Sequence, residues 1–485
     1  MSHAQLPTSS PSDQGVDAGG ILRFVDALEN SPTQDPHSLM ILRHGHVIAQ
    51  GWWAPYSSQR RHLLYSLSKS FTSAAAGIAI SEGLLDLDEP AISYFPELDA
   101  DITDERSRSI LVRHLASMST GHTFDTLEQA QRNDPLDVVR GFLLLPPERD
   151  PGTVFAYNQP ATYTLATIIQ KRSGLSLVDY LRPRLLDPLG IGQVGWQQYP
   201  AGRNIGFSGL FATTDAIARL GQLHLQRGSW LGEQLLPADW VDQASSRQID
   251  TPLPFPDDPT SGVDWQQGYG FQFWMARHGY RGDGAYGQFC VILPEQDAVV
   301  AITSQTDNMQ ETLDAIWRDL LPAFSASSIR SSDSDDALLA RLDGLRVPLP
   351  VTNEQTRAAT WNDASFSPVG GTCAEQPSLH AVRIVRKSGA FVVTLADESG
   401  DLSAPFTAAD WSIGDADAGS APIAVAGGWV NDTVLHLDVV FFETPHRLRL
   451  SCDSTTREFT AHWVTAPLRL DSTPLSDLKT PSPLG

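Results

Sequence analysis

The pattern of apolar residues changes beyond residue 336, and this change limits the folds that the chain can adopt. Up to residue 323, alternating runs that suit strands mix with longer amphipathic runs that suit helices. Residues 324–336 are mostly Ser and Asp, a composition typical of a linker. Residues 337–470 consist of short β-rich runs with turn residues between them, such as "HAVRIVRKSGAFVVTLA". We therefore predict a mixed helix–strand domain over residues 21–323 and an all-β domain over residues 337–470.

Both ends of the chain are predicted to lie outside these domains. Residues 1–20 are rich in Ser, Pro and Gly and indicate a flexible N-terminal arm, and residues 471–485 indicate a polar tail. The arm has neither the basic residues nor the apolar run of a signal peptide or membrane anchor. No stretch reaches the roughly 20 apolar residues that span a bilayer, so we expect no membrane association.

The composition excludes some partners. The formal net charge is −23, which argues against binding to nucleic acids or anionic membranes, because phosphate groups need clustered cations. Cys290, Cys373 and Cys452 lie far apart without metal-ligand spacing. We expect them to be buried thiols of a cytoplasmic protein, with no metal and no cofactor.

The first domain shows recognisable elements. "LMILRHGHVIAQGWW" predicts two strands joined at Gly45, and residues 68–83 predict a helix that ends at Gly83. Residues 110–204 are predicted to be mainly helical. The domain closes with two strands, "QFCVILP" and "AVVAITSQ", and the helix "ETLDAIWRDLLPAF".

The motif "YSLSKSF" carries candidate chemistry. Ser66 and Lys69 are three residues apart at the start of the predicted helix, so one helical turn places the amine beside the hydroxyl. A lysine in an apolar niche can lose its proton and accept one from serine, and a helix N-terminus offers N–H groups to an oxyanion. The same spacing in Ser476 and Lys479 falls in the Pro- and Ser-rich tail, where no helix is predicted to shape a site.

Around this motif the chain resembles the penicillin-recognising serine hydrolases, which include class C β-lactamases, DD-peptidases and β-lactamase-like esterases. The resemblance extends from about residue 37 to 323 and includes "ILVRHLASMSTGH", "PGTVFAYNQPATYTLATIIQKRSG" and "YGQFCVILPEQDAVVAITS" in the expected order. It implies an α/β (α+β) fold of the β-lactamase/transpeptidase type, with an antiparallel sheet flanked by helices and a helical insertion. It also implies that Ser66 is the nucleophile and Lys69 its partner.

The family's second motif is Tyr-x-Asn, and "AYNQ" supplies its tyrosine as Tyr157. The third position is Gln159 instead of Asn. Its amide can still bind Lys69 or a substrate carbonyl, and Asn158 is the alternative for that role. Tyr163 is a rival tyrosine that we interpret as a buried aromatic residue.

The family's third motif aligns with "RGDGAYGQ", which gives Gly282-Asp283-Gly284 and resembles a branch of these hydrolases with RGDGA-x-GQ here. The resemblance implies that these residues bind substrate and that the N–H groups of Ser66 and Ala285 hold the oxyanion. The usual motif grips a substrate carboxylate with a cation and a hydroxyl. Gly282 has neither, which favours a neutral or cationic substrate and argues against a β-lactamase. Arg281 either compensates or forms a salt bridge with Asp283.

A literal third-motif match, Lys387-Ser388-Gly389, is rejected because it lies between two β-rich runs of the second domain and is typical of a hairpin turn.

We therefore expect a serine hydrolase that cleaves an ester or amide of a small molecule or short peptide through an acyl-enzyme on Ser66. A D-amino-acid amidase or peptidase, a β-lactam-binding enzyme and a non-catalytic scaffold that keeps the fold are alternatives. The sequence leaves open whether Lys69 or Tyr157 is the base, whether the second domain covers the site or only stabilises the first, and the oligomeric state.

Overall fold

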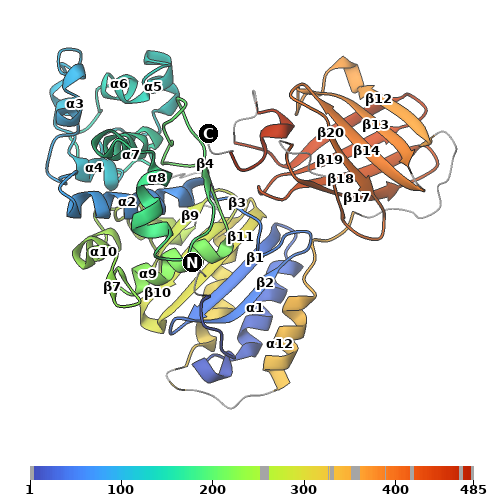
Figure 1. Cartoon of the computed structure of the whole chain (residues 1–485), viewed down its shortest axis with the longest axis horizontal. Helices are drawn as coiled ribbons and strands as arrows, with labels where there is room; N and C mark the ends of the chain where they lie inside the picture. The colour runs from blue at the N-terminus through green and yellow to red at the C-terminus, as the bar shows by residue number, and fades with distance from the viewer. Residues whose placement is uncertain are drawn as a thin grey trace.

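Six antiparallel strands form the central sheet of the first domain (Figure 1). The computed structural model describes residues 5–251, 262–325, 327, 333–350, 361–387, 389–414, 420–468 and 473–481. The strand order is β2 (His46–Trp52), β1 (Gln34–Arg43), β11 (Ala298–Thr306), β10 (Gln288–Leu293), β9 (Tyr280–Gly284) and β8 (Trp274–Met275). Because β1 pairs with β11, the beginning and the end of the domain meet in the middle of the sheet.

Both faces of this sheet are buried, and the alternation of side chains along the strands divides them between two cores. Leu39 and Ile41 lie in one core with helices α1 (Ala18–Asn30), α11 (Met309–Ala315) and α12 (Asp333–Asp343). Met40 and Leu42 lie in the other core with α2 (Ser68–Ser81) and α9 (Thr214–Leu225). Helix α2 ends at Ser81, two residues before the predicted end at Gly83. Gly83 has the left-handed φ of +68° that commonly follows a helix terminus.

A helical region lies where the sequence predicted an insertion (Figure 1). Its longest helix, α7, packs against α4, α6 and α2, and its first residue, Gln159, contacts Lys69 at the start of α2. The helices of the region are α3 (Glu105–Arg108), α4 (Val112–Ala116), α5 (Leu127–Asn133), α6 (Val138–Leu143), α7 (Gln159–Ser173) and α8 (Leu177–Leu181). A small three-stranded sheet joins β3 (His62–Leu63), which precedes the helical region, to β5 (Leu210–Ala212) and β4 (Gly195–Trp196). The hairpin of β6 (Ser229–Trp230) and β7 (Glu233–Gln234) and helix α10 (Ala238–Ala244) come later in the chain.

The second domain is all-β, as predicted. Among the described residues it forms a nine-stranded sheet that curls into a nearly closed barrel, with β15 returning beside β17. In spatial order the strands are β15 (Leu402–Phe406), β14 (Ala390–Asp397), β13 (Leu379–Lys387), β12 (Asp363–Pro368), β20 (Glu458–Thr465), β19 (Arg447–Asp453), β18 (Val434–Phe441), β17 (Ile423–Trp429) and β16 (Ser412–Ile413). Of the rejected Lys387-Ser388-Gly389 sequence, Lys387 is the last residue of β13 and Gly389 directly precedes β14, while Ser388 lies outside the described residues.

The predicted flexible arm is wrong for residues 5–17. The backbone N–H of Ser9 donates to the carbonyl of Val47 (3.1 Å), and the N–H of Val47 donates to the carbonyl of Pro7 (2.8 Å). β2 is the edge strand of the sheet, and this segment pairs with the backbone groups of Val47 on its open side.

The boundary between the domains also differs from the prediction. Part of the predicted linker and the start of the predicted β domain form α12, whose Leu338 and Leu342 are buried in the core of the first domain. The Ser and Asp residues that suggested a linker supply the acidic first turn of this helix, which suits the positive end of its dipole.

The described part of the predicted tail, residues 473–481, is packed between the domains (Figure 1). Leu475 and Leu478 lie in the barrel core. The N–H of Thr480 donates to the Glu443 carboxylate (2.7 Å), and Thr480 also lies against Gly195 of the first domain.

The three cysteines are free and buried. Within the described ranges, no helix combines the length and the apolar character needed to cross a membrane.

Candidate active site

Ser66 lies in a tight turn that leads into α2. The turn, Tyr65–Leu67, is a short 3-10 helix, and Lys69 follows in the first turn of α2. Tyr65 has a left-handed φ of +47°, and the hydroxyl of Ser68 donates to its carbonyl (2.6 Å). The chain thus bends sharply at the residue before Ser66, which presents this hydroxyl at the start of a helix.

Lys69 is 1% exposed and its amine has three acceptors. Nζ donates to the Ser66 hydroxyl (3.0 Å), to the Gln159 side-chain oxygen (2.7 Å) and to the Phe207 carbonyl (2.8 Å). Burial lowers the pKa of Lys69 to about 7, although the carboxylates of Asp125 and Asp283 oppose this change.

These three partners give the amine a defined orientation when it is neutral. A neutral amine has two N–H bonds and one lone pair. The Gln159 oxygen and the Phe207 carbonyl only accept hydrogen bonds, so they take the two N–H groups. The lone pair then points at the Ser66 hydroxyl, which is the one partner of the three that can donate a proton.

Tyr157 forms the wall beside this amine. Lys69 Nζ lies 4.5 Å from the centre of its ring, and the ring stacks on Trp274 at 5.3 Å. Burial raises the pKa of the Tyr157 phenol, and the Asp283 carboxylate raises it further. An ionised Tyr157 is therefore less accessible near neutral pH than a neutral Lys69.

The structure separates the two amide candidates. Gln159 begins α7 and contacts Lys69, whereas Asn158 is fully buried and faces away. The side-chain oxygen of Asn158 accepts from the N–H (2.9 Å) and the hydroxyl (3.0 Å) of Thr126. The expected role of Asn158 in substrate binding is wrong, because these bonds turn its side chain into the helical region.

Gly282 and Gly284 pack against the nucleophile helix and its turn. A Cβ at Gly282 would lie 2.3 Å from the Ser70 hydroxyl, and one at Gly284 would lie 2.1 Å from the Leu64 carbonyl. Strand β9 therefore approaches so closely at these positions that no Cβ fits, and substrate binding by Gly282 and Gly284 stays a prediction. Gly284 lies against the Ser66 turn, which brings the following residue, Ala285, near the nucleophile.

Asp283 is not a substrate contact. It accepts from Arg281 Nε at 3.0 Å, and the two side chains are 6% and 0% exposed. Arg281 further donates to the carbonyls of Asp264 (3.1 Å) and Met275 (3.0 Å). The salt bridge proposed as one alternative from the sequence is present, so Arg281 is not available to bind a carboxylate.

A cavity of about 320 Å³ opens above Ser66. Its walls are mainly apolar, and it contains two carboxylates, those of Asp125 and Asp477, but no lysine or arginine among its described lining residues. The barrel and the tail supply part of the wall. These residues are Thr444, His446, Pro467, Leu468, Thr473, Asp477 and Leu478.

Asp125 and Phe207 belong to the site although no sequence pattern pointed to them. Asp125 Oδ1 accepts from the N–H of Gln159 (3.0 Å) and thereby fixes the start of α7, and burial raises the pKa of its carboxyl group. Phe207 binds Lys69 through its backbone carbonyl, so the identity of its side chain does not mark this role in the sequence. Both contacts join segments that are distant in the sequence.

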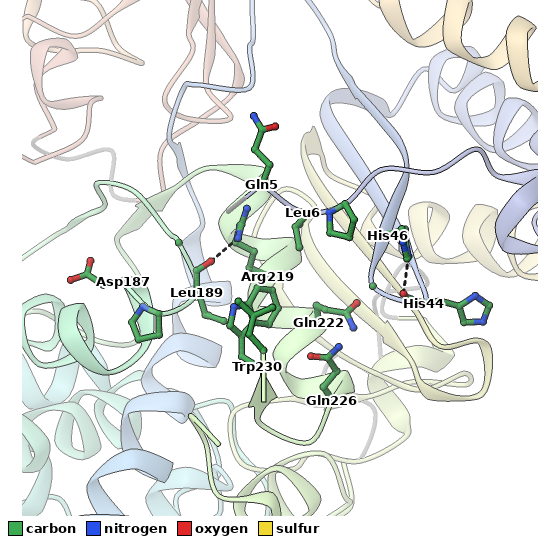
Figure 2. A pocket seen from close by; sticks show the side chains of 15 residues that line it. Gln5, Leu6, His44, His46, Asp187, Leu189, Arg219, Gln222, Gln226 and Trp230 are labelled. Carbon is green, nitrogen blue, oxygen red and sulfur yellow. Dashed lines mark hydrogen bonds between the residues drawn. The ribbon is translucent and has the colours of Figure 1, made fainter. Parts of the chain in front are cut away.

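A second cavity, of about 770 Å³, lies away from these residues (Figure 2). It is formed by the N-terminal segment, the turn at His44 and His46, and α9, and Arg219 at its edge donates to the Leu189 carbonyl (2.6 Å). It contains none of the candidate catalytic residues. The described residues include no group of three or more His, Cys, Asp or Glu side chains arranged to hold a metal ion.

Comparisons with known proteins identify the family and the fold of the first domain. The family model described as Beta-lactamase matches residues 36–323. A 6-aminohexanoate-dimer hydrolase from Paenarthrobacter ureafaciens is 26% identical over 296 residues, which cover 54% of this chain and 71% of the relative. A lovastatin esterase from Penicillium rubens is 29% identical over 162 residues, 29% of this chain and 40% of the relative. The solved structure of EstCE1, a hydrolase with promiscuous acyltransferase activity, is similar in fold, with a TM-score of 0.51, 17% identity and coverage of 64% of this chain and all (100%) of that one.

Proposed function

This chain belongs to the beta-lactamase family, and we propose that it is a serine hydrolase that cleaves an ester or amide of a small molecule or short peptide through an acyl-enzyme on Ser66. The observation that carries the proposal is the set of partners around Lys69, which directs the lone pair of a buried, easily neutralised amine at the Ser66 hydroxyl.

The proposed reaction has two steps, acylation and deacylation of Ser66, joined by one covalent intermediate. Lys69 accepts the proton of Ser66 as Oγ attacks the substrate carbonyl, and the N–H groups of Ser66 and Ala285 stabilise the oxyanion. The proton held by Lys69 then passes through the Tyr157 hydroxyl to the leaving alcohol or amine as its bond to the carbonyl breaks, which leaves Lys69 neutral and Tyr157 protonated. Water then attacks the ester on Ser66 and gives a proton to the neutral Lys69, and this proton goes to Oγ as the acid leaves.

The charge of the cavity supports a substrate without an acidic group near the scissile bond. Asp125 lies close to Ser66, Arg281 is engaged with Asp283, and position 282 carries no side chain. A carboxylate next to the scissile bond would meet acidic groups without a cation to pair with. We therefore propose neutral or cationic substrates. The names of the two relatives, an amino acid dimer hydrolase and an esterase, support both amides and esters.

The test is a matched panel of p-nitrophenyl esters and p-nitroanilides whose acyl groups are cationic, neutral or anionic but of equal length. We expect kcat/KM to be higher for cationic and neutral acyl groups than for anionic ones. Asp125→Asn should weaken the preference for the cationic group, and Asp401→Asn, a surface change on the barrel, should leave it intact. A preference for anionic acyl groups would contradict the proposed substrate class.

A further inference from the structure

The two residues that flank the proposed oxyanion donors have unusual backbone conformations. Tyr65 precedes Ser66 and has a φ of +47°, and Tyr286 follows Ala285 and has a φ of +66°. A bulky residue seldom adopts a left-handed φ, because its Cβ approaches the backbone too closely. Such a conformation persists where surrounding contacts hold it, and here it occurs on both sides of the oxyanion hole.

The barrel holds both tyrosines through their hydroxyl groups. His446 Nδ1 lies 3.1 Å from the carbonyl of Thr465, which only accepts, so Nδ1 carries the proton. Nε2 of His446 is then an acceptor for the hydroxyl of Tyr65, at 2.7 Å. The hydroxyl of Tyr286 donates to the carbonyl of Ala466 at 2.6 Å. Both connections therefore end on neighbouring residues at the end of β20.

The three rings also pack against one another. Tyr65 and Tyr286 are 5.6 Å apart, and His446 lies 5.9 Å from Tyr65 and 5.8 Å from Tyr286, all with edge-to-face geometry. His446 is 1% exposed, and burial lowers its pKa to about 3, so it stays an acceptor for Tyr65 across the ordinary pH range. The ring contacts and the hydrogen bond to His446 together fix the position of each tyrosine relative to the other.

We propose that the barrel sets the geometry of the oxyanion hole, with His446 as a positioning residue that acts through Tyr65 and with the Ala466 carbonyl acting through Tyr286. This inference rests on the proposed function, because it concerns the N–H groups of Ser66 and Ala285. Domain docking alone does not require these bonds. Other contacts join the domains, including the N–H of Leu63 to the Glu443 carbonyl (2.7 Å) and the surface pair of Arg346 and Asp410 (3.0 Å).

The experiment removes each hydroxyl or acceptor in the full chain with Tyr65→Phe, Tyr286→Phe and His446→Phe. Deleting an oxyanion-hole donor costs roughly 100- to 1,000-fold in kcat, so displacing one should cost about tenfold. We expect this loss in kcat for a p-nitrophenyl ester, little change in KM, and an equal loss of affinity for a boronic acid that mimics the tetrahedral intermediate. Tyr65→Phe combined with His446→Phe should be no worse than either alone, because both remove the same bond.

Two controls separate positioning from stability. Tyr180→Phe removes a hydroxyl bonded to Glu82 at the far end of α2, and Asp410→Asn removes a docking contact; neither should change kcat or boronic acid affinity. Unchanged kcat and boronic acid affinity in folded Tyr65→Phe and Tyr286→Phe would overturn the inference, as would an effect on KM alone. If the unmodified chain reacts with no ester or amide, the proposed function fails. Crystal structures of the two tyrosine variants then decide the inference, which is overturned if both left-handed turns persist.

Discussion

Replacing Gln159 by Glu tests the assignment of Lys69 as the base. The Gln159 oxygen lies 2.7 Å from Lys69 Nζ, and Gln159→Glu would put a carboxylate there without changing the length of the side chain. An opposite charge this close favours the ammonium form and raises its pKa by roughly 1–3 units. The pKa of Lys69 would then move from about 7 to a value near 9.

The size of the effect follows from the fraction of neutral amine. At pH 7 about half of Lys69 is neutral in the unmodified chain, against about 1% when the pKa is near 9, so acylation should slow roughly 50-fold. The base is the neutral form, so the rate should rise with pH through about 7 in the unmodified chain and through about 9 in the variant. The rates should converge at higher pH.

The assay is kcat/KM for a p-nitrophenyl ester between pH 5 and 10, corrected for spontaneous hydrolysis. Gln159→Met is the matched control: it removes the acceptor without adding charge, so the inflection should stay near 7 or move below it. An inflection that stays at the same pH in Gln159→Glu would refute the assignment of Lys69 as the base. A uniform loss of rate at every pH would show that Gln159 only shapes the site.

Three further changes test other parts of the structure. Gly284→Ala places a Cβ 2.1 Å from the Leu64 carbonyl and should push β9 from the Ser66 turn, lowering kcat/KM at least about 100-fold; a variant with near-normal activity would show that this contact is unimportant. Leu468→Ala shortens a side chain that lines the cavity and is 62% exposed, so the melting temperature should not change. Turnover of bulky esters should rise relative to that of acetate esters, and an unchanged ratio of the two rates would exclude a limit on substrate size at Leu468. Leu338→Ala in α12 should lower the free energy of unfolding by about 2–5 kcal/mol in urea titrations, and a loss below about 1 kcal/mol would argue against α12 as part of the first domain's core.

The sequence predicted the elements whose patterns are local. Short continuous apolar runs in "QFCVILP" and "AVVAITSQ" identified β10 and β11, and the Gly83 stop signal placed the end of α2 within two residues. The prediction was wrong at residues 333–336, because Ser and Asp are typical both of linkers and of the first turn of a helix. Tertiary packing of Leu338 and Leu342 decides between these outcomes.

For the site, the spacing of Ser66 and Lys69 was informative because both lie within one helical turn. The sequence did not decide between Asn158 and Gln159. That choice depends on the hydrogen bonds from Thr126 to Asn158, and no sequence pattern indicates that these two residues are partners. The contact between His446 and Tyr65 joins residues 381 positions apart, and neither neighbourhood carries a motif. Contacts of this kind follow from the docking of two domains, which local patterns do not specify.

Covalent labelling of Ser66 tests the central claim most directly. The full chain is incubated with a fluorophosphonate probe at pH 8, and the adduct is measured by intact mass and located by peptide mapping. We expect one adduct, on Ser66, which Ser66→Ala abolishes. Ser476→Ala should leave it unchanged, although Ser476 has the same spacing to a lysine. Failure of the folded chain to react, or an adduct at another serine that persists in Ser66→Ala, would contradict the assignment of Ser66 as the nucleophile.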